Sequence, residues 1–143
     1  MNSRTSLVLV LVTLAITGAS ARVDSATAVP QGSSSWCAGA LTWSQARARV
    51  GRVVKLKARV AGALYAASSN GQPTFIDLGR RYPNPGRLTL LIWGRSRVNF
   101  PTAPERMFRG GTTVCARGRV SLYRGVPEIE LSRWNASARM LVS

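Results

Sequence analysis

Histidine is absent from this 143-residue chain, and acidic side chains are scarce, because only five Asp and Glu residues accompany 20 Lys and Arg residues. General acid–base catalysis most often uses histidine or paired carboxylates, and zinc sites need histidine or clustered cysteine. The sequence therefore predicts no enzyme activity, no catalytic residue, no metal site and no cofactor. Glu128 and Glu130 share one face of a strand pattern, but a solvated strand edge is the commoner reason for such spacing. Asp77 is expected to pair with a neighbouring arginine.

A long apolar run is also missing. The run Leu7–Ile16 is short, whereas crossing about 30 Å of hydrocarbon takes roughly 20 apolar residues. Arg4 precedes it and the small residues Ala19, Ser20 and Ala21 follow, which is typical of a secretory signal peptide. The sequence predicts a signal peptide over residues 1–21, with cleavage after Ala28 as the alternative. We therefore expect a secreted or periplasmic protein without stable membrane insertion.

Cysteine is limited to two residues, Cys37 and Cys115. In an exported chain the oxidising compartment favours one disulfide between them. Cys115 is expected to point outward from its strand, where the segment around Cys37 could cross it. Two free thiols are the alternative.

The rest of the chain is long enough for one domain. Residues 22–35 are rich in Ser, Ala and Gly and predict a flexible leader. The domain is expected over residues 36–143. Near its start, Thr42 and Gln45 have the spacing of a capping box, which predicts a short helix ending near Gly51.

The stretch Gly71–Gly94 has the pattern of a β-hairpin. Thr74–Leu78 alternates with period two, Leu88–Trp93 is apolar and β-rich, and Gly79–Gly86 between them has strong turn chemistry. If Ile76 and its period-two neighbours face the core, Phe75 and Asp77 face outward. Parity then places Thr89, Leu91 and Trp93 on the same outer surface.

Three further strands and a connector are expected. Arg52–Ala61 alternates between apolar residues and a basic outer row, and a loop is expected over Gly62–Gln72. Arg95–Phe108 is expected to be a connector with helical turns near its end. Thr112–Tyr123 and Glu128–Leu131 alternate again, with Val114, Ala116, Val120 and Leu122 facing inward and Cys115, Arg117, Arg119 and Tyr123 facing outward. Arg133–Val142 is expected to be a tail strand or strap.

The order of these elements predicts a fold class. Strand, hairpin, connector and second hairpin correspond to the plan of the OB fold. We expect an all-β, five-stranded OB-fold barrel with a short N-terminal helix and a helical connector between strands three and four.

Particular segments extend this likeness to a family. They resemble OB-fold modules of the tRNA-anticodon-binding type, which occur in bacterial exported proteins and beside secreted nucleases. The segments that carry the resemblance are Gly51–Val60, Pro73–Gly79, Leu91–Gly94, Phe100, Gly118–Val120 and Tyr123–Leu131. The resemblance implies that Phe75, on the second strand, stacks on a base.

The formal net charge of +15 favours an anionic partner. All but two of the basic residues are arginine, which binds phosphate bidentately and stacks on flat rings. Single-stranded DNA or RNA is the expected ligand, because aromatic rings among arginines suit its bases and phosphates. An envelope oligosaccharide or another polyanion is the alternative. The candidate nucleic-acid-binding residues are Lys55, Lys57, Arg59, Phe75, Arg80, Arg81, Trp93, Arg117, Arg119, Tyr123 and Arg124.

Overall fold

The computed structural model describes residues 35–134 and 137–141. The predicted signal peptide and all but the last residue of the predicted leader lie outside these residues. No helix within the described ranges is long and apolar enough to cross a membrane.

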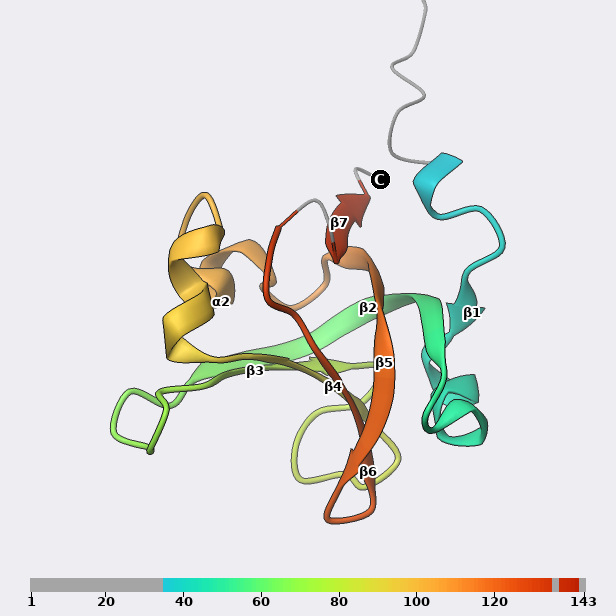
Figure 1. Ribbon diagram of the computed structural model, residues 1–143, viewed down its shortest axis with the longest axis horizontal. Helices are drawn as coiled ribbons and strands as arrows, with labels where there is room; N and C mark the ends of the chain where they lie inside the picture. Colours follow the sequence, from blue (N-terminus) through green and yellow to red (C-terminus); the bar gives the residue numbers. More distant parts are fainter. Residues whose placement is uncertain (1–34, 135–136, 142–143) are drawn as a thin grey trace, which may run out of the picture.

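One sheet organises the described part of the chain (Figure 1). The pairings run β2–β3–β4–β6–β5, and β5 also pairs with β2, so five main strands form a circuit. Within it β4 and β6 are parallel and the other ladders are antiparallel. This all-β architecture is OB-fold-like, as the order of elements predicts. The strands are β1 (Leu41–Thr42), β2 (Val53–Tyr65), β3 (Thr74–Leu78), β4 (Leu88–Ile92), β5 (Thr113–Tyr123), β6 (Val126–Glu130) and β7 (Ala138–Leu141).

β2 is longer than its sequence pattern indicates. Its first half pairs with β5 and its second half with β3, with a register shift between Val60 and Gly62. A bulge of this kind bends a strand, which lets β2 serve two ladders. The prediction of a loop from Gly62 is wrong, because pairing with β3 keeps the run of small residues extended to Tyr65.

The core fills the inside of the circuit. The fully buried side chains Leu56, Ile76, Leu90, Val114 and Ile129 each come from a different strand of it. The inward positions follow the predicted alternation with one exception. Leu122 is 48% exposed, because it lies near the end of the β5–β6 hairpin, which protrudes from the other strands (Figure 1), so the prediction that it faces inward is wrong.

Helical segments pack against this core. The 3-10 helix η1 (Trp43–Arg49) begins with the predicted capping box, in which the Thr42 N–H donates to Gln45 Oε1 at 2.9 Å. The predicted connector forms the 3-10 helix η2 (Gly94–Asn99) and helix α2 (Pro104–Met107). After them Phe108 is fully buried, with its ring centroid 6.3 Å from Phe100 and 5.8 Å from Trp134.

Arg97 attaches this connector to the strands. Its guanidinium lies 3.6 Å from the ring centroid of Tyr65 and donates to the Thr74 hydroxyl. It also donates to both carboxylate oxygens of Glu105, at 2.8 and 3.2 Å. The hydrogen bond from Arg97 holds the pKa of the Glu105 carboxyl below its usual value, against the opposing effect of burial. One side chain thus joins η2 to α2, β2 and β3.

The predicted disulfide between Cys37 and Cys115 is confirmed, with the two Cα atoms 5.9 Å apart. Cys115 is fully buried, although Arg117, the next residue on the same outer row of β5, is exposed. The segment around Cys37 covers it, as expected. Nearby, the Lys55 ammonium lies 5.4 Å from the centroid of the Trp36 ring. The predicted tail strand is β7, which pairs antiparallel with β5.

Candidate functional site

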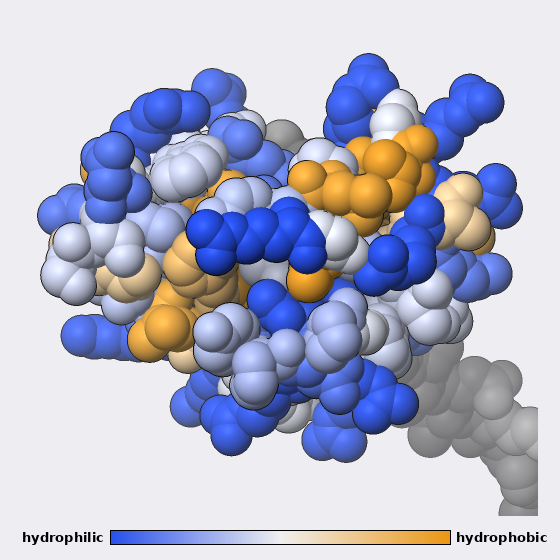
Figure 2. Space-filling model, turned by 90° about the horizontal axis from the view of Figure 1, so that it is seen from below, coloured by the Kyte–Doolittle hydropathy of each residue, from blue (hydrophilic) through white to orange (hydrophobic). Residues whose placement is uncertain are grey.

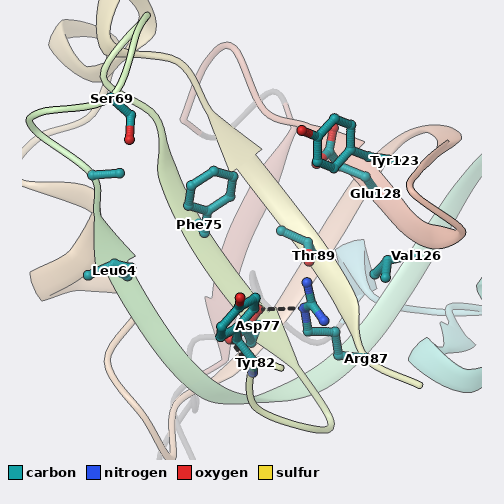
Figure 3. A pocket seen from close by; sticks show the side chains of 11 residues that line it. Leu64, Ser69, Phe75, Asp77, Tyr82, Arg87, Thr89, Tyr123, Val126 and Glu128 are labelled. Carbon is teal, nitrogen blue, oxygen red and sulfur yellow. Dashed lines mark hydrogen bonds and ion pairs between the residues drawn. The ribbon is translucent and has the colours of Figure 1, made fainter. Parts of the chain in front are cut away.

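A cavity of about 410 Å³ lies on the outer face of β3 and β4. The loop after β2, the loop after β3 and the β5–β6 hairpin surround it (Figure 3). Its lining residues are Leu64, Ala66, Ser69, Phe75, Asp77, Tyr82, Arg87, Thr89, Tyr123, Val126 and Glu128. Strands 2 and 3 of an OB fold, which correspond to β3 and β4, present the face that binds oligonucleotides and oligosaccharides in other proteins.

Strand register explains how the cavity floor forms. Asp77 pairs with Thr89 across β3 and β4, and Thr89 pairs with Glu128 across β4 and β6. These three polar residues make one row across three strands. In the next row Phe75 pairs with Leu91. The floor therefore combines an aromatic ring with a row of polar side chains.

The rim of the cavity is apolar and exposed. Leu64, Tyr82 and Tyr123 are 63%, 74% and 59% exposed, and Phe75 is half-buried below them. Exposed apolar side chains gathered around a hollow mark a ligand site more often than scattered ones do. Figure 2 shows the molecule from the side of the β5–β6 hairpin, where hydrophobic groups lie between projecting hydrophilic side chains.

One wall of the cavity is fixed by an ion pair. Arg87 Nε lies 3.2 Å from Asp77 Oδ1, and the Tyr82 N–H donates to Asp77 Oδ2 at 2.8 Å. The Arg87 guanidinium lies 5.1 Å from the centroid of the Tyr82 ring and donates to the Asn84 carbonyl oxygen at 2.9 Å. The prediction that Asp77 pairs with a neighbouring arginine is confirmed. This network holds the β3–β4 loop and uses both Asp77 oxygens.

Two polar groups of the floor are not engaged in this way. Thr89 is 5% exposed, and its Oγ1 has no hydrogen-bond partner among the described residues. Glu128 is half-buried, and burial, together with the nearby Glu130 carboxylate, raises the pKa of its carboxyl. The interpretation of Glu128 as a solvated strand edge is therefore wrong, because Glu128 forms part of the cavity wall.

The predicted arginines of the two loops lie beside this cavity. Arg124 follows Tyr123 at the tip of the β5–β6 hairpin, with its guanidinium 5.4 Å from the Tyr123 ring centroid. Arg80 and Arg81 are exposed in the loop that also supplies Tyr82 and Arg87. Arg81 passes close over Gly62, where a Cβ atom would lie 3.0 Å from its Nε.

The remaining candidates lie elsewhere. Lys55, Lys57, Arg59, Arg117 and Arg119 belong to the β2–β5 ladder, in which Lys55 pairs with Arg117, and none of them lines the cavity. In the circuit, β2 of this ladder also pairs with β3, and β5 also pairs with β6. The structure thus divides the predicted binding residues between the cavity and a separate basic row.

Trp93 belongs to neither group. It follows the last residue of β4 and precedes η2. Its ring packs against the loop after β2, so that a Cβ atom at Gly71 would lie 2.9 Å from it. The expectation that Trp93 ends a strand and joins the outer surface with Phe75 is wrong, because β4 ends at Ile92.

Comparisons with known proteins give fold-level likenesses only. No protein-family model matches this chain, and no curated protein matches its sequence. Asparaginyl-tRNA synthetase from Pyrococcus horikoshii overlaps 72% of this chain at 12% identity and a TM-score of 0.49. Aspartyl-tRNA synthetase from Entamoeba histolytica overlaps 65% at 15% identity and a TM-score of 0.41. The Stn1–Ten1 complex of S. pombe overlaps 64% at 14% identity and a TM-score of 0.44.

The overlap covers 23% and 19% of the two synthetase chains, and 60% of the Stn1–Ten1 chain. The overlapped region is a small part of each synthetase chain. The strand pairing described above, rather than these overlaps, carries the OB-fold-like assignment.

Proposed function

We propose that this protein is an exported, non-enzymatic OB-fold module that binds single-stranded nucleic acid in the cavity over β3 and β4. The circuit of five paired strands supports the barrel of that fold. One observation carries the proposal: Phe75 lies half-buried in a cavity with exposed Tyr82 and Tyr123 at its rim and arginines in the adjoining loops. Every base offers a flat face to such rings, and each stacked base contributes about 1 to 3 kcal/mol.

The distribution of charge supports a base inside the cavity and phosphates outside it. The charged side chains that line the cavity are two carboxylates, Asp77 and Glu128, and the guanidinium of Arg87, which pairs with Asp77. A phosphate would meet the carboxylate of Glu128 there. Arg80, Arg81 and Arg124 lie in the flanking loops, where a backbone leaving the cavity would pass.

Export is supported by two observations. The first residues have the pattern of a secretory signal peptide, and the Cys37–Cys115 disulfide suits an oxidising compartment.

An oligosaccharide of the envelope is the second candidate, and the composition of the cavity favours it specifically. Carboxylates beside aromatic rings accept hydrogen bonds from sugar hydroxyls, and OB folds also serve as oligosaccharide binders. The two candidates differ in salt dependence, because binding a phosphate backbone releases counterions and binding a neutral sugar does not.

Phe75→Ala tests the proposal. Loss of the stacking ring is expected to weaken binding of single-stranded oligonucleotides by about 1 to 3 kcal/mol and to leave the salt dependence unchanged. Fluorescence anisotropy at several salt concentrations measures both quantities, and thermal melting shows whether the variant is folded.

Arg124→Ala is the matched variant for charge. It is expected to weaken binding of every polyanion, heparin included, and to reduce the slope of log affinity against log salt by about one or less. A folded Phe75→Ala protein that binds single strands as tightly as the parent would contradict the proposal. Binding of neutral oligosaccharides without binding of oligonucleotides would select the second candidate.

A further inference from the structure

The floor of the cavity holds two hydrogen-bonding groups without partners in the described part of the protein. Thr89 Oγ1 is buried and unpaired. No described side chain donates a hydrogen bond or forms an ion pair with the Glu128 carboxylate, whereas Asp77 is engaged by Arg87 and Tyr82. Thr89 and Glu128 are direct neighbours across the parallel β4–β6 ladder. In Figure 3 the Thr89 side chain lies between Phe75 and the side of the cavity formed by Val126 and Glu128.

We propose that Thr89 and Glu128 form a subsite that selects a base carrying an exocyclic amino group over thymine or uracil. This inference rests on the proposed function, and it adds the class of base to it. A carboxylate accepts hydrogen bonds but donates none, whereas a threonine hydroxyl both donates and accepts. The pair can therefore receive an amino group and satisfy the ring nitrogen beside it.

Base chemistry decides between the candidates. Cytosine and adenine each present an amino group beside a ring nitrogen that accepts a hydrogen bond, so that Glu128 accepts and Thr89 donates. Guanine presents an amino group beside a ring N–H, and the Glu128 carboxylate can accept a hydrogen bond from each of them. Thymine and uracil flank their single N–H with two carbonyl oxygens, at least one of which would face the Glu128 carboxylate. The N–H of such a base can donate to Glu128 and one carbonyl can accept from Thr89, so the loss of affinity comes from the second carbonyl, which the carboxylate repels.

The burial of Thr89 argues against a purely structural role for the pair. Buried hydroxyls in folded proteins nearly always have a hydrogen-bond partner, and the strand neighbours Asp77 and Glu128 provide none here. The unpaired Oγ1 has almost no exposed surface of its own, but Thr89 lines the cavity of about 410 Å³, where rotation about χ1 would turn the hydroxyl toward a bound base. Phe75, in the adjacent row, would support the flat face of the same base.

Binding of deoxyoligonucleotides of one length, dC, dA or dT only, tests the inference. The parent protein is expected to bind dC or dA about tenfold more tightly than dT, a difference of about 1.4 kcal/mol, because a thymine carbonyl faces the Glu128 carboxylate. Glu128→Gln should remove most of this preference, because the glutamine amide donates to a thymine carbonyl. Thr89→Val, which keeps the shape of the side chain, should also reduce it.

Glu130→Gln is the control. It removes the same charge from the next outward position of β6, where the carboxylate is exposed, and should change affinity for all three oligonucleotides alike. Equal affinity of the parent for dC, dA and dT would overturn the inference and leave the proposed function standing if Phe75→Ala still weakens binding. The inference is also overturned if Glu128→Gln and Glu130→Gln change the preference equally. Absence of any oligonucleotide binding would overturn both proposals.

Discussion

The charge that Glu128 offers to a ligand in the cavity also lowers the stability of the folded protein. Burial and the neighbouring Glu130 raise the pKa of its carboxyl above the ordinary value of 4.5. Asp77, Arg87 and Tyr123 also line the cavity, but the ion pair of Arg87 is with Asp77 and not with Glu128. The folded state therefore binds the Glu128 proton more tightly than the unfolded state does. This contribution to stability is complete below about pH 4.5 and is lost as the pH rises through the folded pKa.

Glu128→Gln is accordingly expected to raise the melting temperature at pH 7 and to give little gain near pH 4, where the parent carboxyl is mostly protonated in both states. Thermal melting of the parent and the variant from pH 4 to pH 8 measures the difference. Glu130→Gln, at an exposed position, should show a much smaller pH-dependent gain. A Glu128→Gln protein that is less stable than the parent at pH 7 would show that the carboxylate has a stabilising partner.

At this scale the sequence predicts the faces of strands well and the contents of the cavity only in part. Period-two alternation places Phe75, Asp77 and Thr89 outward because successive side chains on a strand point to opposite faces. It gives no information about Ser69 or Tyr82, whose positions depend on the path of a loop. Glu128 has the pattern of an exposed edge, and only the pairing of β6 with β4 shows that it is half-buried.

Among the elements, the η2–α2 connector depends on Arg97. Replacing Arg97 by alanine removes its hydrogen bonds to Thr74 and Glu105 and its stacking on Tyr65. It leaves the fully buried Thr74 hydroxyl and the partly buried Glu105 carboxylate without this donor. Because hydrogen bonds to charged groups contribute about 1.5 to 3 kcal/mol, Arg97→Ala is expected to lower the free energy of unfolding by about 2 to 3 kcal/mol. Urea unfolding measures this loss.

Arg95→Ala provides the matched comparison on the same helix. Its side chain and that of its partner Glu130 are 80% and 50% exposed, and the closest charged atoms are 4.0 Å apart. Such surface pairs contribute about 0 to 1 kcal/mol, so little change is expected. Equal losses of unfolding free energy in the two variants would show that Arg97 does not hold the connector against the strands.

The strands and helices themselves could be predicted better than the way in which the strands pair. Local alternation identifies the strands, and Pro104 with the residues after it predicts the helical turns of α2. The bend in β2 could not be predicted, because Ala61, Gly62 and Ala63 resemble a loop until pairing with β3 is known. The position of Trp93 could not be predicted either, because the sequence does not show that β4 ends at Ile92 or that the Trp93 ring packs against the loop after β2.

For the whole molecule, the net charge of +15 predicts an anionic partner but not where it binds. The fold places Arg80, Arg81 and Arg124 near the cavity, and the basic row Lys55, Lys57, Arg59, Arg117 and Arg119 on the β2–β5 ladder. Because there are two basic regions, affinity for a polyanion alone would not locate the site. Comparing a substitution inside the cavity with a substitution of an arginine distinguishes binding at the cavity from binding at the basic row.

The disulfide acts at the scale of the whole molecule, because it joins residues 78 positions apart and fastens the segment around Cys37 to β5. Closing so long a loop restricts the unfolded chain and contributes on the order of 4 kcal/mol in the chain-entropy model. Replacing both cysteines by alanine is therefore expected to lower the melting temperature strongly. Affinity for single strands well below that temperature should stay the same, since neither cysteine lines the cavity.

Reduction of the parent protein should reproduce the loss of stability. The double-alanine variant is the control: reductant should not lower its melting temperature further, since it has no disulfide to reduce. Mass spectrometry of the unreduced, natively exported protein then checks that the bond forms during export. Two thiols open to alkylation in that material, or an unchanged melting temperature on reduction, would contradict the prediction. Because Cys115 is fully buried beneath the Cys37 segment, alkylation should become measurable only after reduction and unfolding.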